Sequence, residues 1–480
     1  MDSRPCNTVW MRDLARLAGY ELTMYPREKC GNLHEGADPE DELKWLDKEI
    51  GDTDYLIISA DGLCSGGLVQ ARLGQIDLKQ TLNKLEVLSR YKKRYPNLRI
   101  YLFDTIMRTT ITAYGPDTEI YWGKMNEFSR LTGRVHFFHD PEEEMRLEEL
   151  KKEIPASIVE IFLNARKIKH ELNKYFLGLV SDRVLDYMIL LQEDAMPYGI
   201  QKIEQEILQK MIAEQNLGKR VKFYNGTDEG GVVLLGKILM QEKGITPKIY
   251  LHLPEADALK KVMLFEDQPF SENLANMMDT MGFLKTKNAD EADFILSVYA
   301  EKPNVNLHTN TTEPILPEKN KRYYEFIRKI DSFLYSKKPV ALVDLLFPNG
   351  GSPDLLLNLE FSKLKTYSAW NTASNAMGSA LCEMASHLVN PKNPSTKFRD
   401  ERFLDDCLYQ YTVRRIVNEK YLKLGYNVYD LGQGNDLVLG EIKTLMDHLG
   451  GWLGKQNYKI TLPWQRTFEA EIEIEEKYEI

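Results

Sequence analysis

The chain has 480 residues, of which 43% are hydrophobic and 28% are charged, a composition typical of a globular protein with roughly two to four domains. Its formal net charge of −10 argues against non-specific nucleic-acid binding, because that function needs a basic surface. We therefore expect no nucleic-acid partner. The sequence predicts no particular oligomeric state.

Membrane and export signals are absent from the sequence. No stretch approaches the about 18 continuous apolar residues that a membrane span needs. The first ten residues have no apolar core of the kind found in signal peptides. The five cysteines are scattered and form no CxxC pair, which indicates a reducing compartment without disulfides or a cysteine zinc site. We expect a cytoplasmic protein with no membrane partner.

Short apolar runs alternate with amphipathic stretches over most of the chain. Most of the runs are continuous rather than alternating, as in parallel strands that helices cover on both faces. This order predicts an α/β fold with a mainly parallel sheet. The predicted strands are 22–26, 55–60, 99–103, 186–192, 221–225, 248–253, 292–298, 339–346 and 365–370. Predicted helices include 78–95, 143–178 and 320–336.

Nine candidate strands exceed the eight of a single barrel. We favour a TIM-barrel-like region over 1–390 that carries extra strands. The alternative is a pair of doubly wound lobes, divided near 215–290. Residues 391–480 begin with a polar, proline-containing linker and are predicted to form a small appendage of helices, near 399–424 and 436–449, and terminal strands.

Polar residues follow strand after strand. In parallel α/β folds, ligands bind beyond the carboxyl ends of the strands, so we expect these side chains to share one pocket. Capping of the next helix is the alternative for any one Asp or Asn. Capping explains neither the number of these residues nor the arginines beside acids, since charges at the end of an apolar strand need partners. The candidates are Asp61, Arg72, Asp104, Arg108, Asn225, Asp228, Glu229, Asn349, Trp370, Asn371 and Asn375.

The run 186–192 ends on two adjacent acids, Glu193 and Asp194, before a turn with Pro197 and Gly199. Two close carboxyl groups do not both ionise easily, so one has its pKa raised and can act as a general acid. The other stays ionised and can orient a substrate or stabilise positive charge. Glycosidases use such a pair. We therefore take Glu193 and Asp194 as the candidate catalytic residues, with a helix cap as the alternative.

The same acids fit other chemistry. Carboxylates are ligands for Mg²⁺ or a similar hard ion, so a metal-dependent hydrolase or lyase is the second hypothesis. A sugar- or metabolite-binding protein without turnover is the third. Only the second hypothesis needs a cofactor, a divalent metal. The proposed metal ligands are Asp61, Asp104, Glu193, Asp194 and Asp228.

Taken together, the motifs resemble a bacterial family catalogued as domain-of-unknown-function family 4127, over nearly the whole chain. The resemblance adds Asp2, Arg4 and Asn7 to the candidate binding residues. Family members carry an apolar strand before this first motif, and we expect that strand to be missing or reduced beside Asp2 and Arg4. The matching stretches are 2–7, 61–72, 104–108, 192–199, 226–230, 349–350 and 370–378.

A looser likeness is to β-N-acetylglucosaminidases of the O-GlcNAcase type. These enzymes resemble the chain in placing two adjacent carboxylates at a strand end and asparagines at late strand ends. The likeness implies that Glu193 orients a substrate acetamido group and that Asp194 is the general acid. We expect a carbohydrate-active hydrolase for a small glycan, in which arginines tune the acids or bind a substrate carboxylate and Trp370 stacks on a sugar.

Overall fold

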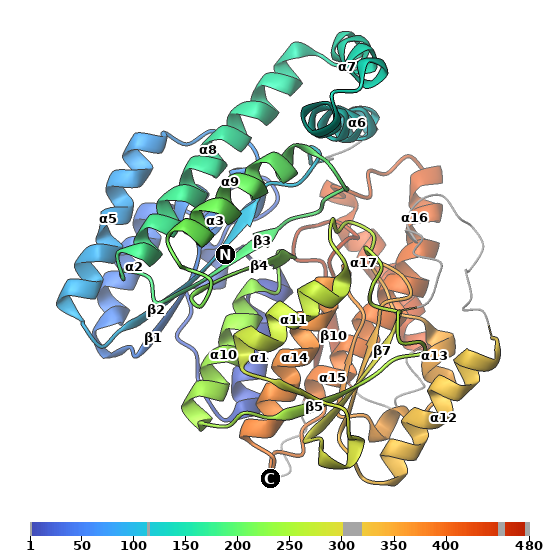
Figure 1. Ribbon diagram of the computed structural model, residues 1–480. Coiled ribbons are helices and arrows are strands. Elements are labelled where there is room, and N and C mark those ends of the chain that lie inside the picture. Colours follow the sequence, from blue (N-terminus) through green and yellow to red (C-terminus); the bar gives the residue numbers. More distant parts are fainter. Residues whose placement is uncertain (1, 113–115, 301–318, 450–456, 476–480) are drawn as a thin grey trace. The chain divides into compact units, whose positions relative to one another are not determined.

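Nine parallel strands form two separate sheets among the residues that the computed structural model describes, which are 2–112, 116–300, 319–449 and 457–475 (Figure 1). The chain divides into two units, each with one of these sheets. Unit 1 comprises Met1–Thr8, Leu22–Leu234 and Phe265–Gln268. Unit 2 comprises Val9–Glu21, Leu235–Leu264 and Pro269–Ile480.

The sheet of unit 1 has four parallel strands in the order β1-β2-β3-β4. Its strands are β1 (Tyr55–Ser59), β2 (Arg99–Ile106), β3 (Tyr187–Gln192) and β4 (Val221–Asn225). Its helices are η1 (Pro5–Asn7), η2 (Arg27–Lys29), α2 (Pro39–Glu49), η3 (Ile50–Asp52), α3 (Ala60–Ser65), α4 (Leu68–Ala71), α5 (Leu78–Arg94), α6 (Pro116–Phe138), α7 (Pro141–Glu153), α8 (Ala156–Ser181) and α9 (Ile200–Glu214).

Helix α5 illustrates how sequence builds this layer. Asp77 caps it by accepting a hydrogen bond from the Gln80 backbone N–H at 2.9 Å, and three basic residues in its last turn complement the helix dipole. Its apolar face places Leu85 and Leu88 in the core with Leu102 of β2. Full burial of each such side chain contributes about 1.5–3 kcal/mol. Helices α6 and α7 lie side by side at one end of α8 (Figure 1).

The sheet of unit 2 has five parallel strands in the order β6-β5-β7-β8-β9. They are β5 (Lys248–His252), β6 (Leu284–Thr286), β7 (Phe294–Tyr299), β8 (Val340–Asp344) and β9 (Thr366–Ser368). The helices are α1 (Val9–Ala18), α11 (Phe270–Met281), η4 (Ala289–Glu291), α12 (Lys321–Tyr335), α13 (Pro353–Leu357), η5 (Phe361–Lys363), α14 (Ala373–Val389), α15 (Lys397–Arg402), the π-helix η6 (Phe403–Val413), α16 (Arg414–Lys423), η7 (Gly432–Gly434) and α17 (Asn435–Leu449).

Helix α14 is central to unit 2. Its side chains are buried almost without exception, and many are Ala, Ser or Gly, which let α1 and α11 pack closely against it (Figure 1). Ser386 donates a hydrogen bond to the Leu14 carbonyl of α1 at 2.9 Å. An antiparallel pair, β10 (Tyr458–Thr461) and β11 (Glu471–Ile474), also belongs to unit 2. Helix α10 (Gly230–Lys243) begins in unit 1 and continues into unit 2.

The α/β class and the mainly parallel sheets are confirmed. The strand pairing does not confirm a barrel, which stays a prediction. The strand predicted at 22–26 is wrong, because Tyr25 of that run instead packs on Trp45 and donates its hydroxyl to Asp41 at 2.7 Å. The short strand β6 was not predicted, since its three residues contain one apolar side chain.

The helix predicted at 143–178 is two helices, α7 and α8. The break falls at Ile154 and Pro155 because proline disfavours helical backbone in the residue before it and lacks an N–H of its own. Within the described ranges, no helix is long and apolar enough to cross a membrane.

Candidate functional site

A small cavity of about 10 Å³ lies at the carboxyl ends of β1, β2 and β4. A cavity of that size holds about one water molecule. Four predicted binding residues, Asp2, Asn7, Asp61 and Asp228, are therefore brought together from the N-terminal segment and from the ends of β1 and β4. The lining is Asp2, Asn7, Ser59, Asp61, Leu68, Phe103, Thr105, Thr227 and Asp228.

Arg4 joins two of these carboxylates. Its guanidinium donates to Asp2 Oδ2 at 2.8 Å and to Asp228 Oδ1 at 2.6 Å, and both acids are buried. Asn7 donates to Asp2 Oδ1 at 2.8 Å. Burial alone raises the pKa of Asp2, but Arg4 and Asn7 outweigh it, so the net pKa is lowered. Asp2 is therefore ionised and held in place.

A second buried cation, Lys169 of α8, ion-pairs with both Asp61 and Asp104. Asn173, one turn further along α8, donates to Asp104 Oδ2 at 2.7 Å. Burial alone lowers the pKa of Lys169, but Asp104 and Asp61 raise it above its usual value. The lysine is therefore charged, and its charge offsets the two acids.

Glu193 and Asp194 follow the end of β3 and are paired with two arginines, of which Arg108 contacts both acids. Arg72 ion-pairs with Glu193, and Arg108 ion-pairs with Asp194 while its backbone N–H donates to Glu193 Oε2 at 3.2 Å. Burial raises the pKa of Glu193, but Arg72 and Arg108 bring the net pKa below its usual value. The side chain of Asp194 is 29% exposed and that of Glu193 only 3%, so Asp194 is the more accessible of the two acids.

The turn after β4 holds a carboxyl group of another kind. Gly226 has φ +144°, which L side chains rarely adopt, and a Cβ there would also force the Glu229 carboxyl group to move, so the turn favours glycine. Glu229 Oε2 accepts a hydrogen bond from the Thr227 N–H at 2.9 Å, whereas its buried Oε1 makes none. Asn225, at the end of β4, donates to Asp267 Oδ1 at 3.0 Å.

The remaining predicted residues lie in unit 2. The Asn349 N–H donates to the Asn371 carbonyl at 2.6 Å, and Asn375 hydrogen-bonds the Asn371 side chain. Trp370 is 3% exposed and packs edge-on against Trp10, with ring centroids 5.7 Å apart. Sugar stacking by Trp370 therefore stays a prediction, and its packing is that of a core residue.

One protein-family model matches residues 1–473, a span that includes residues of both units. Its description is "Protein of unknown function (DUF4127)". The chain belongs to this family. Every candidate residue predicted from the sequence lies within the matched span. No curated protein matches the chain.

Some residues that hold the site of this DUF4127 member in place are not predicted from the sequence. Lys169 lies within a long helix. The sequence pattern that could have identified it as buried is its position on the same apolar helix face as Ala165 and Leu172. Asp267 accepts hydrogen bonds from Gln205 at 2.8 Å and from Gln201 at 3.1 Å, in addition to Asn225. No local pattern marks Asp267, because its partners are 42 to 66 residues away.

The proposed metal ligands have partners within the chain. Lys169 pairs with Asp61 and Asp104, and arginines pair with Glu193, Asp194 and Asp228. In the part of the chain that the structure describes, no three His, Cys, Asp or Glu side chains gather as a metal site. These five acids form ion pairs with lysine and arginine side chains of the protein itself.

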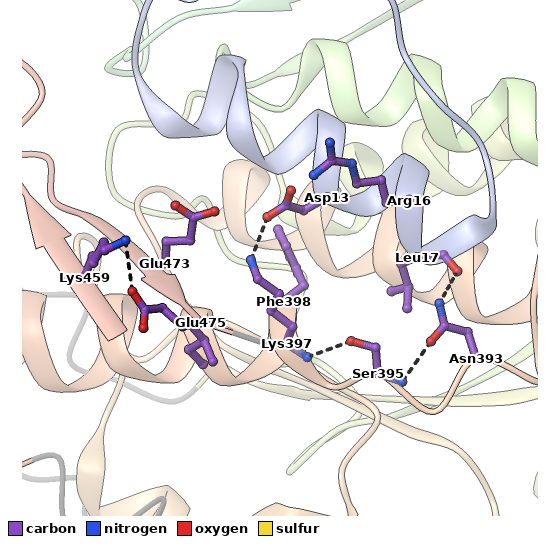
Figure 2. A pocket seen from close by; sticks show the side chains of 11 residues that line it. Asp13, Arg16, Leu17, Asn393, Ser395, Lys397, Phe398, Lys459, Glu473 and Glu475 are labelled. Carbon is purple, nitrogen blue, oxygen red and sulfur yellow. Dashed lines mark hydrogen bonds and ion pairs between the residues drawn. The ribbon is translucent and has the colours of Figure 1, made fainter. Parts of the chain in front are cut away.

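A larger cavity of about 470 Å³ lies in unit 2 (Figure 2). It contains none of the predicted site residues, and charges of both signs line it. Lys397 pairs with Asp13 at 3.0 Å, and Lys459 pairs with Glu475 at 2.9 Å. Since none of the residues predicted from the sequence lines this cavity, the candidate site lies elsewhere, at the carboxyl ends of the unit 1 strands.

Proposed function

We propose that this protein is a hydrolase for a small hydroxyl-rich substrate, a small glycan, which it binds at the carboxyl edge of the unit 1 sheet. The observation that carries the proposal is the convergence of Asp2, Asn7, Asp61 and Asp228 on one point. Carboxylate and amide side chains are hydrogen-bond partners for sugar hydroxyls.

The two carboxylates after β3 take different roles in this proposal. Glu193, held ionised by Arg72 and Arg108, orients the substrate and stabilises positive charge as the bond breaks. Asp194 is the partly exposed member and lies at the scissile bond. Its general-acid role stays a prediction, because Arg108 already occupies part of its carboxylate.

The cavity holds about one water molecule, and a sugar is far larger. The proposal therefore requires the carboxyl edge to open when substrate binds. The start of α3, which carries Asp61, and the turn that carries Asp228 are the segments of the cavity wall that a glycan would displace. We expect faster amide hydrogen exchange in these segments without ligand than with it.

The test is hydrolysis of a panel of aryl glycosides by the wild type, Glu193→Gln and Asp194→Asn. We expect each substitution to lower kcat/KM by about 10²- to 10⁴-fold, the usual contribution of a positioned acid or base. Asp186→Asn is the matched control, since Asp186 precedes β3 at its opposite end and pairs with Lys92 at 2.7 Å. Full activity of Asp194→Asn removes that residue from the reaction. Ligand-induced stabilisation of the wild type without product would instead indicate a binding protein.

A further inference from the structure

Among the residues that the structure describes, Glu229 differs from the other predicted site acids of unit 1 because it forms no ion pair with a cation. It is 2% exposed, and its Oε1 is buried without a hydrogen bond. The neighbouring ionisable groups that interact with it most strongly include Asp228 and Glu266, and it also interacts with the phenol of Tyr224, so these neighbours are acids. Arg4 is engaged by Asp2 and Asp228. A buried carboxylate in such surroundings is costly, and protonation removes the cost.

Glu266 is held near this turn because hydrogen bonds of the adjacent residues anchor the segment Phe265–Gln268. The Phe265 carbonyl accepts a hydrogen bond from the Ala195 N–H at 2.8 Å, and Asp267 accepts one from Asn225. Both anchors belong to unit 1, and Glu266 between them is 2% exposed. The segment therefore places a second buried carboxyl group beside the turn that carries Glu229.

We propose that Glu229 is protonated at neutral pH, because it is buried with an unbonded carboxyl oxygen beside the acids Asp228 and Glu266, and that it supplies the proton to the leaving group. The proton-donor role takes the place of the one predicted for Asp194 and rests on the proposed hydrolysis, whereas the protonation state does not. Thr227 and Asp228 of the same turn line the cavity, so Glu229 lies one residue from its wall.

The proton balance is simple. Glu229 gives its proton to the leaving oxygen as the carbon–oxygen bond breaks. Water adds its hydroxyl to the carbon, and the proton that water releases returns the acid to its starting form. Burial, and then the charges of Asp228 and Glu266, raise the pKa of Glu229 to about 8, although backbone hydrogen bonds lower it. An acid with this pKa carries its proton at neutral pH and can act as a general acid there.

Infrared difference spectroscopy of the full-length wild type against Glu229→Gln tests the protonation state without any substrate. At pH 6 we expect the wild type to show one additional protonated-carboxyl band, which disappears as the pH rises through about 8. Glu206→Gln, at an exposed position on α9, is the control and should leave that band unchanged. A spectrum without the additional band at pH 6 overturns the proposal.

The pH profile tests the catalytic part. In the wild type, kcat/KM should fall tenfold per pH unit above about pH 8, and Glu266→Gln should move this limb to lower pH, because one acid fewer then opposes ionisation. An unmoved limb removes Glu266 from the proposal. If the wild type cleaves none of the glycosides while the infrared band is present, the proposed function fails and the protonated acid stands.

Discussion

At the scale of single residues, the site consists of cations that each hold carboxylates. Arg4 and Lys169 each bind two acids, and Arg72 and Arg108 bind the pair after β3. Burying such ion pairs has a large desolvation cost, and removing one partner leaves an uncompensated buried charge. These six acids thus depend on their cations, whereas Glu229 is proposed to depend on its proton.

Lys169→Met should show this dependence. The substitution leaves Asp61 and Asp104 facing each other without the lysine, and we expect a loss of about 3–5 kcal/mol in unfolding free energy, as for other broken buried pairs. Lys167→Met is the control, since Lys167 is exposed on the same helix. Urea unfolding measures both. Equal stability of the two variants would contradict a charged Lys169.

At the scale of elements, the turn from β4 into α10 carries the most specific local geometry. Gly226 has both a positive φ and no room for a Cβ beside Glu229. The segment Phe265–Gln268 fixes the same turn through Asp267 and Asn225. The conformation of this turn thus depends both on the backbone at Gly226 and on a segment that is distant in the sequence.

Gly226→Ala should therefore be destabilising by about 1–3 kcal/mol or more, because it adds backbone strain to a clash with Glu229. Gly178→Ala is the matched control. A Cβ at Gly178 meets nothing within 4 Å, and the residue lies in α8, so alanine should stabilise by about 0.5–1 kcal/mol. Thermal melting distinguishes the two, and destabilisation of both variants would argue against the local explanation.

At the scale of the whole molecule, unit 1 is assembled from three separate pieces of chain. The third, Phe265–Gln268, contributes Asp267, which accepts hydrogen bonds from Gln201, Gln205 and Asn225. Residues from the two larger pieces supply the cavity. A short segment thereby ties the ends of β3 and β4 and the start of α9 together.

Asp267→Ala tests this link. It removes one acceptor from each of three buried amide side chains and the partner of Lys202, whereas Gln201 and Gln205 keep a second acceptor each. We therefore expect a loss of about 1–3 kcal/mol, the cost of one unsatisfied buried group. Asp257→Ala is the control, because Asp257 has a side chain that is 71% exposed. Chemical denaturation should separate the two variants clearly. If Asp267→Ala unfolds like the control, the segment does not stabilise unit 1.

Much of this organisation follows from the sequence alone. Continuous apolar runs predict eight of the strands, because burial on both faces leaves a local mark. Polar residues after those runs predict the acids at the carboxyl ends, since parallel strands end at one edge. The exceptions are short or mixed segments, as at 22–26, where side-chain packing and a proline override a weak apolar signal.

Tertiary structure alone decided how the acids are neutralised. Lys169 is 108 residues from Asp61, and Asp267 is 42 residues from Asn225. Strand order and helix placement bring such partners together, and no local pattern encodes that order. The physical reason is that strand formation depends on neighbouring residues, whereas the charge state of a buried carboxyl group depends on whichever cation or acid the fold places beside it.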